Sequence, residues 1–346
     1  MEKVLFSNQI ARDLRLFLEN IKYSQLGLIM DSNTQKHCLP LVLDGLPEVF
    51  SRFVFTAGES HKNLETCTQI WKWMTEEGFD RKAFIINLGG GVTGDMGGFC
   101  AATFKRGIRF INLPTTLLSQ VDASVGGKLG IDFMGFKNHI GVFTKPEAVL
   151  IGDVFLHTLP ESELRSGYAE VIKHGLIQDE AYFGLLKFEH WKEQNWRDII
   201  EKSISIKRVV VEKDPREAGL RKILNFGHSI GHAFESKYLD TDRQLLHGEA
   251  IAIGMIAEAY LSHLKSGLSV SELESIEEAL LKVFPKFDFE EEEIPGIIKL
   301  CTQDKKNEGS QIYFSLLSSI GKCDFNVPVT EQDIYEAIKH YRNLHL

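Results

Sequence analysis

The chain has few cysteines, and none of them forms a metal-type or redox-type pair. Five cysteines occur in 346 residues, at positions 38, 67, 100, 301 and 323, and no C-x-x-C motif joins any two of them. An odd and scattered set of this kind excludes a disulfide framework. It predicts reduced, buried thiols in a cytoplasmic protein.

Several other patterns are missing. No apolar run approaches the length of a membrane span, and the N-terminal stretch MEKVLFSNQIARDL has no signal-peptide pattern. The chain has no internal repeat and no low-complexity linker. Its formal net charge is −9, which argues against nucleic acid or an anionic membrane as the main partner. We therefore expect a soluble protein with neither kind of partner.

The remaining composition is that of an ordinary globular protein, with 43% hydrophobic and 25% charged residues. Its length predicts two domains, and the pattern changes near residue 155. Residues 1–155 alternate apolar runs with helical stretches such as Leu64–Glu77, which is typical of a parallel sheet covered by helices. The predicted strands are Leu26–Met30, Phe53–Thr56, Phe84–Leu88, Arg109–Leu113 and Ala148–Ile151.

Residues 156–346 favour a mainly helical domain, because apolar residues recur there at helical spacing. The only late strand signal is Gln311–Leu317. The predicted helices are Ser162–Ile177, Arg197–Lys213, Ile223–Tyr238, His247–Lys265 and Val270–Val283.

A glycine turn stands inside the stretch FIINLGGGVTGDMGGF, between a predicted strand and an amphipathic segment. Gly89, Gly91 and Gly94 satisfy G-x-G-x-x-G, and Gly90 completes a triplet. Glycine lets a backbone approach a phosphate, and the N-terminus of the following helix attracts it. The turn does not follow the first predicted strand, and no acidic residue ends the next one. We expect a dinucleotide bound by a variant of the usual scheme; a tight structural turn is the alternative.

Other polar residues follow the ends of the predicted strands, where ligands of such folds bind. These residues are Asp31, Glu59, Thr115 and Thr116.

Metal-type residues concentrate in the second half, in the clusters AEVIKHG, NFGHSIGHAFE and LHGEA. One carboxylate and two imidazoles with an open position make a catalytic zinc site. The clusters contain the carboxylates Glu170, Glu235 and Glu249 and the histidines His174, His228, His232 and His247. Spacing alone selects His228 and His232, which are four residues apart on one helix face, but it does not decide which two histidines join a carboxylate. Histidines of the core or the surface are the alternative. The motif is not H-E-x-x-H, which argues against a zinc protease.

Residues that bind phosphate are dispersed along the chain. Lysine and arginine near a glycine turn suit a phosphorylated substrate, although each one alone is more often a surface charge. The set consists of Asp122 and Lys128 in DASVGGK, Lys137 and Asn138 in FKNHIG, and Lys207, Arg221 and Asn225 on or near later helices.

The order of these motifs resembles the 3-dehydroquinate synthase family from about residue 57 to residue 321. The segments are GGGVTGD, KRGIRFINLPTTLLSQVDASVGGK, FKNHIGVF, LRSGYAEVIKHGLI, LRKILNFGHSIGHAFE, LLHGEAIAIGM and DKKNEG. The resemblance implies a Rossmann-like α/β N-terminal domain and a mainly α-helical C-terminal domain, similar in fold to metal-dependent glycerol dehydrogenases. It also implies a cytoplasmic homodimer.

The activity implied by the resemblance belongs to the shikimate pathway, which leads to chorismate and the aromatic amino acids. With NAD and a divalent metal, zinc or cobalt, the family converts 3-deoxy-D-arabino-heptulosonate 7-phosphate to 3-dehydroquinate and phosphate. The steps are oxidation of an alcohol by NAD, β-elimination of phosphate, return of the hydride, and an intramolecular aldol closure. The reaction is redox-neutral, and the enzyme is a lyase.

The resemblance also implies residue roles. The metal ligands would be Glu170, His228 and His247, which leaves His232 to the substrate. NAD contacts would be Asp31, Glu59, Lys62, Gly89, Gly90, Gly91, Gly94, Asp95, Thr115, Thr116, Lys128 and Lys137. Substrate and catalytic contacts would be Arg106, Asp122, Lys128, Lys137, Asn138, Lys173, Lys207, Arg221, Asn225, His232 and either Lys305 or Lys306.

The sequence departs mildly from the family pattern. AGESHK replaces the usual acidic-Gly-Glu run before Lys62, and Phe136 replaces a glycine before Lys137.

Three other functions remain open at this stage. A cyclase that makes an inosose or a valiolone would share the NAD and metal residues but differ at the substrate contacts. A polyol dehydrogenase would lack the set of cations and would release NADH. A non-catalytic binding protein would need neither the metal clusters nor the cations.

Overall fold

A computed structural model describes residues 3–123, 126–134, 136–303 and 311–344. The chain divides into two compact units, Met1–Leu164 and Arg165–Leu346. The sequence places the domain boundary at residue 155, and the contacts place it within the first turns of a helix, α6 (Glu161–Gln178). Lys305 and Lys306 lie outside the described residues. Along the described parts of the chain, no helix has the length and apolar character needed to cross a membrane.

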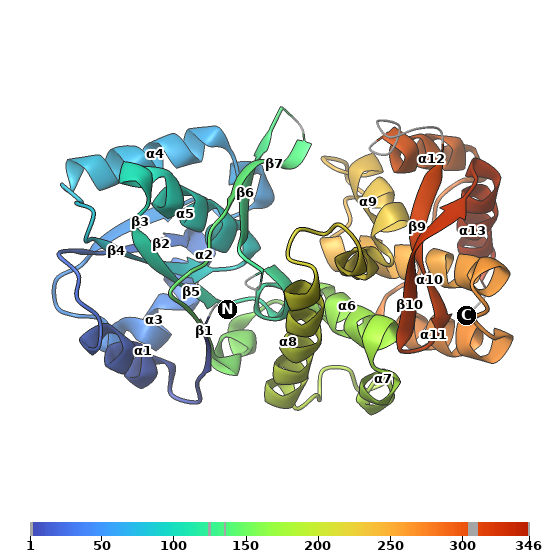
Figure 1. Cartoon of the computed structure of the whole chain (residues 1–346), viewed down its shortest axis with the longest axis horizontal. Helices are drawn as coiled ribbons and strands as arrows, with labels where there is room; N and C mark the ends of the chain where they lie inside the picture. The colour runs from blue at the N-terminus through green and yellow to red at the C-terminus, as the bar shows by residue number, and fades with distance from the viewer. Residues whose placement is uncertain (1–2, 124–125, 135, 304–310, 345–346) are drawn as a thin grey trace. The chain divides into compact units, whose positions relative to one another are not determined.

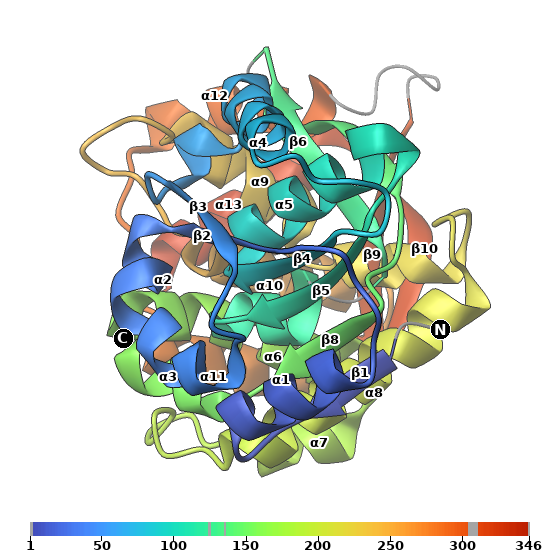
Figure 2. The same cartoon turned by 90° about the vertical axis from the view of Figure 1, so that its left-hand side faces the viewer.

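The first unit (Figure 1) is built on a parallel sheet with the strand order β1-β8-β5-β4-β2-β3, which can be followed in Figure 2. Its strands are β1 (Lys3–Phe6), β2 (Leu26–Asp31), β3 (Ser51–Phe55), β4 (Phe84–Gly89), β5 (Arg109–Pro114) and β8 (Ala148–Ile151). All five predicted strands are therefore confirmed. The sequence missed β1, so the first predicted strand is the second of the fold.

Helices cover both faces of this sheet, which is why its central strands are apolar on both sides. Leu28 and Met30 of β2 enter one hydrophobic core, and Ile29, which points the other way, enters the second. Figure 2 shows α1 and α3 on one side of the sheet and α4 and α5 on the other. The helices are α1 (Ile10–Glu19), α2 (Ser32–His37), α3 (Leu39–Val42), α4 (Leu64–Glu76) and α5 (Gly91–Thr103).

A separate hairpin of β6 (Lys128–Phe133) and β7 (Phe136–Phe143) contributes to the core on the α5 side of the sheet. No strand pattern marks β7 in the sequence, because most of its residues are exposed and leave no apolar alternation to detect.

The second unit is mainly helical, as predicted, and centres on α10 (His247–Lys265). This helix is apolar around almost its whole circumference, as expected of a helix with neighbours on every side. It contacts α9, α11, α13 and β9 (Figure 1). The other elements are α7 (Glu180–Leu185), α8 (Trp196–Lys213), α9 (His228–Lys237), α11 (Val270–Val283), α12 (Ile294–Gln303), α13 (Glu331–Asn343), β9 (Ile312–Ser319) and β10 (Lys322–Val329).

Two predictions for this unit need correction. The single helix expected over Ile223–Tyr238 is broken into a 3-10 helix, Leu220–Asn225, and α9. Gly227 between them has a φ of +79°, which no α-helix accommodates. The strand signal at Gln311–Leu317 corresponds to β9, but its partner β10 was missed. An internal Pro328 and an irregular register weaken the strand pattern of β10.

Candidate active site

The glycine turn lies at the point where the order of the sheet reverses. Strand β2 pairs with β3 on one side and with β4 on the other, so the chain changes direction across the sheet between them. Ligands of open parallel sheets bind at the carboxyl ends of such strands. Asp31 ends β2 and Gly89 ends β4, and a small cavity lies beside Asn87, Gly89, Gly94 and Asp95.

Lack of space, and not a left-handed backbone, explains Gly89 and Gly90. A Cβ on Gly89 would lie 2.2 Å from Thr93 Oγ1, and one on Gly90 would lie 3.1 Å from Thr116 Cγ2. Neither residue has a positive φ. Helix α5 begins at Gly91, and no side chain caps it. Its first backbone N–H groups are therefore available as hydrogen-bond donors for a phosphate.

Asp31 and Thr115 support the turn structurally. Asp31 Oδ1 accepts hydrogen bonds from Asn33 N at 2.8 Å and Thr34 N at 2.9 Å, which caps α2. Its second oxygen, Oδ2, accepts one from Thr93 Oγ1 at 3.3 Å. Thr115 N donates to Gly89 O at 3.0 Å. The ends of β2, β4 and β5 are thus tied together around the first turn of α5.

Lys62 is buried and joins two predicted site residues. Its Nζ lies 2.6 Å from Asp95 Oδ2 and 2.7 Å from Asn138 Oδ1. Burial alone lowers the pKa of Lys62, but the carboxylates of Asp95 and Glu59 outweigh it and raise this pKa. Lys62 is therefore a charged group. Asn138 has a φ of +52°, and its N–H donates to Asp132 Oδ1 at 2.7 Å.

A strained turn presents Arg106. Lys105, Arg106 and Gly107 have consecutive φ values of 50°, 70° and 111°, a conformation that costs free energy for the two residues with a Cβ. Such outliers cluster at functional sites, which agrees with the predicted role of Arg106. Asp122 lies in a short π-helix at Ser119–Ala123, and Lys128 and Lys137 are exposed on the β6–β7 hairpin.

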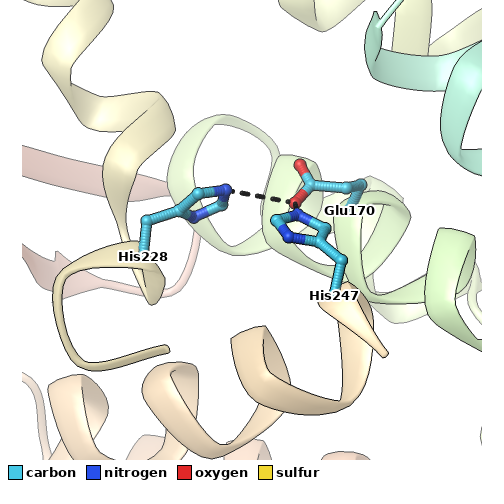
Figure 3. A group of neighbouring side chains, drawn as sticks. All are labelled: Glu170, His228 and His247. Atoms are coloured by element: carbon cyan, nitrogen blue, oxygen red, sulfur yellow. Dashed lines mark ion pairs between the residues drawn. The ribbon is translucent and has the colours of Figure 1, made fainter. Parts of the chain in front are cut away.

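In the second unit, Glu170, His228 and His247 converge. Glu170 lies within α6, while His228 and His247 are the first residues of α9 and α10. Glu170 Oε1 lies 3.4 Å from His228 Nε2 and 3.5 Å from His247 Nε2. Figure 3 shows the three side chains pointing toward one another. The three ligand atoms all lie within 4.8 Å of one another.

The far side of each imidazole has its own partner. His228 Nδ1 lies 3.1 Å from the carbonyl oxygen of Phe226, so in the neutral ring Nδ1 carries the proton and Nε2 carries the lone pair. His247 Nδ1 lies 3.7 Å from Glu235 Oε2. A carboxylate or carbonyl behind a histidine is the usual support of a metal ligand, because it fixes the tautomer and the ring.

Burial and neighbouring charges shift the pKa values of all three residues of this cluster. Burial alone would raise the pKa of Glu170, but Lys173, which forms an ion pair with it, and His228 hold this pKa well below its usual value. Burial and the charge of Lys173 lower the pKa of His228, which favours the neutral imidazole. Burial acts in the same direction on His247, but Glu170 and Glu235 outweigh it and raise its pKa to about 9.

His232 lies beside this cluster without joining its carboxylate. Its ring centroid is 5.0 Å from that of His228 and 5.9 Å from that of His247. Among the described residues, the groups with metal-ligand spacing place His232 with Glu235 and His247, and none contains both His228 and His232. The pair that spacing alone selected is therefore not joined to a shared carboxylate.

Three more predicted substrate residues lie in the second unit. Lys207 is buried on α8. Arg221 is buried, and its guanidinium donates to Pro215 O at 2.9 Å. Asn225 Nδ2 donates to Glu217 Oε1 at 2.9 Å.

One carboxylate near the cluster was missed by the sequence reasoning. Glu258 is buried on α10 and accepts two backbone hydrogen bonds at the start of α9, next to His228. Its signal was a lone acidic residue in the apolar run AIAIGMIAEAYL.

Known proteins resemble this chain along nearly its whole length. Residues 52–166 match the family described as 3-dehydroquinate synthase N-terminal, and residues 167–307 match 3-dehydroquinate synthase C-terminal. The chain is 42% identical over 347 residues to 3-dehydroquinate synthase of Parabacteroides distasonis, covering 99% of this chain and 98% of that protein.

Two solved structures share the fold at 25% identity. A 2-deoxy-scyllo-inosose synthase complexed with carbaglucose-6-phosphate, NAD+ and Co2+ has a TM-score of 0.83, covering 97% of this chain and 96% of that one. The 2-epi-5-epi-valiolone synthase of Streptomyces hygroscopicus, with NAD+ and Zn2+ bound, has a TM-score of 0.85, covering 99% and 96%. With both of its halves matched and a close relative along nearly its whole length, the chain belongs to the 3-dehydroquinate synthase family.

Proposed function

We propose that this protein is an NAD- and metal-dependent 3-dehydroquinate synthase. It would convert 3-deoxy-D-arabino-heptulosonate 7-phosphate to 3-dehydroquinate and phosphate. The observation that carries the proposal is the family match along nearly the whole chain. The group of Glu170, His228 and His247 supports it, because it offers the donor set that such chemistry requires.

The three side chains fit a divalent ion. Ligands about 2.1 Å from a tetrahedral zinc ion are separated from one another by roughly 3.4 Å. Glu170 Oε1 lies 3.4 Å and 3.5 Å from the two Nε2 atoms, which is that separation. Bound there, zinc or cobalt would act as a Lewis acid that polarises a substrate alcohol. The lowered pKa values of Glu170 and His228 keep both groups in the form that binds metal.

The dinucleotide would bind at the carboxyl ends of β2, β4 and β5. Support comes from the uncapped start of α5, the cavity beside it and the close packing of Gly89 and Gly90. NAD supplies a hydride acceptor that is regenerated in the same cycle. Its proposed contacts are Asp31, Glu59, Lys62, Gly89, Gly90, Gly91, Gly94, Asp95, Thr115, Thr116, Lys128 and Lys137.

The remaining polar residues would bind the substrate. Cations suit a departing phosphate dianion, and an amide supplies a neutral donor. The guanidinium of Arg221 and the amide of Asn225 are already held by Pro215 and Glu217, which limits their movement. The proposed set is Arg106, Asp122, Lys128, Lys137, Asn138, Lys173, Lys207, Arg221, Asn225 and His232.

The reaction explains the need for both cations and proton carriers. Oxidation of one alcohol to a ketone acidifies the neighbouring C–H, and phosphate then leaves by β-elimination. After the carbonyl is reduced again, the ring opens and recloses as a carbocycle through an aldol step. Side chains at the site hold the leaving phosphate, move protons and exclude water.

A related sugar-phosphate cyclase is the alternative, favoured by the two solved structures of similar fold. Incubating the protein with the heptulosonate phosphate, NAD and Zn2+ separates the two. We expect release of free phosphate and formation of dehydroquinate, with glucose 6-phosphate as a control that gives neither. Phosphate release from the control sugar alone would reassign the substrate.

We also propose that the protein is a homodimer. The β6–β7 hairpin exposes Phe133, Met134, Phe136 and Phe143, a set of large apolar side chains that a second copy would cover. Light scattering of the purified protein measures the mass directly. A monomer at micromolar concentration would contradict the proposal.

A further inference from the structure

Glu258 is a buried carboxylate with no place in the proposed chemistry. Its residue is 0% exposed, in the middle of α10, and it is the only charged residue between Ala250 and Leu261. A carboxylate in such surroundings is costly unless hydrogen bonds satisfy its oxygens. Its partners therefore show why a charge is kept there.

Both oxygens of Glu258 accept backbone N–H groups from the start of α9. Oε2 accepts from Gly227 N at 2.6 Å, and Oε1 accepts from Ile230 N at 3.0 Å. Gly227 is the N-cap of α9, and Ile230 is the third residue of the helix. These are the two N–H groups that a capping box satisfies. Gly227 has no side chain to do so, and one carboxylate from α10 performs both halves of the box.

The close crossing of α9 and α10 explains why a side chain of α10 caps the start of α9. Gly227 has a φ of +79°, and a Cβ on it would lie 2.5 Å from Met255 Cγ. A Cβ on Gly254 would lie 1.9 Å from Gly227 O. The start of α9 is thus pressed against α10, and both Gly227 and Ile230 are buried there. Glu258 lies one turn after Gly254 on α10 and meets their N–H groups.

The segment that Glu258 holds also carries a metal-type histidine. His228 lies between the two bonded residues, and its Nδ1 is bonded to the carbonyl of Phe226. The position of the ring therefore depends on the backbone from Phe226 to Ile230, which Glu258 fixes at two points. We propose that Glu258 is a positioning residue for the divalent metal, acting through the first turn of α9 on His228. This inference rests on the proposed metal role of Glu170, His228 and His247.

The test is Co2+ binding by the full-length protein after metal removal with a chelator. In Glu258→Gln the side chain keeps its shape, but its NH2 group faces a backbone N–H. We expect Co2+ affinity to fall by about 10- to 100-fold, the usual effect of removing a partner that supports a metal ligand. The visible absorption spectrum of bound Co2+ should also shift, because the ligand geometry changes.

Glu272→Gln is the matched control. Glu272 also accepts two backbone N–H groups, Ser269 N at 3.0 Å and Ile320 N at 2.9 Å, and it caps α11, which carries no proposed ligand. Both variants should lower the Tm of the metal-free protein by about 2–4 °C. Only Glu258→Gln should change Co2+ affinity and the spectrum.

The inference is overturned if Glu258→Gln binds Co2+ with wild-type affinity and spectrum, or if Glu272→Gln weakens binding equally. If Glu258→Gln does not fold, Glu258→Asp replaces it in the test. This variant keeps the charge but is one methylene shorter, and the same changes in Co2+ affinity and spectrum are expected of it. The readout does not depend on turnover. A wild-type protein that binds Co2+ but makes no dehydroquinate would overturn the proposed function and leave the role of Glu258 intact, whereas wild-type protein without Co2+ binding would overturn the inference itself.

Discussion

The ammonium group of Lys62 donates a hydrogen bond to the side-chain oxygen of Asn138 at 2.7 Å, while it also binds Asp95 at 2.6 Å. It thereby joins the glycine-turn helix α5 to the β6–β7 hairpin. Because a lysine can only donate, the amide oxygen of Asn138 faces Lys62 and the NH2 group points elsewhere. Asn138 is thus held, in a left-handed conformation, as an oriented donor.

Replacing Lys62 with methionine should slow turnover. The change removes both bonds, leaves Asp95 without its cation and releases Asn138. Hydrogen bonds to charged groups contribute roughly 1.5–3 kcal/mol, so we expect kcat/KM to fall by about 10- to 100-fold. The measurement is phosphate release at saturating metal. Lys72→Met is the control, since Lys72 is exposed on α4 beside Glu76, and its activity should stay at the wild-type level.

The pH dependence of this effect has a definite sign. Asp95 and Glu59 outweigh burial and raise the pKa of Lys62, so its stabilisation holds at neutral pH and is lost only as the pH rises through that raised value. The deficit of Lys62→Met should therefore be equal at about pH 7 and about pH 9, both below the usual lysine pKa. A deficit that disappears at the higher pH would show that Lys62 is not the cation described here.

Gly227→Ala should destabilise the protein strongly, because it combines two costs. The φ of +79° is unfavourable for alanine by roughly 1–2 kcal/mol, and the contact of its Cβ with Met255 adds roughly 1–3 kcal/mol. Gly267→Ala separates these costs, since Gly267 has a φ of +90° but nothing within 4 Å of its Cβ. Urea unfolding should give roughly 2–5 kcal/mol for the first variant and 1–2 kcal/mol for the second. Equal losses of unfolding free energy in the two variants would mean that α9 and α10 move apart to relieve the contact with Met255 at no cost in free energy.

The sequence predicted the helices and strands that are buried on one face or on all sides, because such burial leaves a regular pattern of apolar residues. The central strands of the sheet and the helix over His247–Lys265 follow from apolar runs and helical periodicity. It missed the exposed strand Phe136–Phe143 and the break at Gly227. These depend on a hairpin and a helix crossing, which are contacts between distant parts of the chain.

The candidate site shows the same division. The resemblance to the family, and not residue types or spacing, named Glu170, His228 and His247, and the structure brings these three side chains together. Periodicity places His228 and His232 on one face of α9, but it contains no information about which of them meets a carboxylate on α6. The sequence also could not predict that Glu258 caps α9. The N–H groups that it accepts from lie about thirty residues earlier in the chain, and periodicity contains no information about such distant contacts.

NAD should be required but not consumed. The glycine turn occurs in a protein whose proposed reaction is redox-neutral, so the hydride taken in one step is returned in a later one. We expect many molecules of phosphate per NAD, with no steady rise in absorbance at the NADH wavelength. A polyol dehydrogenase would accumulate NADH in proportion to product, and that result would reassign the chain.

The three histidines near Glu170 should differ in what their removal does. His228 and His247 each place Nε2 within 3.5 Å of Glu170 Oε1, whereas His232 joins a group with Glu235 and His247 instead. A zinc ion left with two protein ligands is poorly held. We therefore expect His228→Ala and His247→Ala to lose bound metal on dialysis. His232→Ala should retain about one equivalent and yet lose about a hundred-fold in turnover, if this residue moves protons. Metal analysis of the three purified variants decides the matter, and a metal-free His232→Ala beside a loaded His247→Ala would show that the ligand set proposed here is wrong.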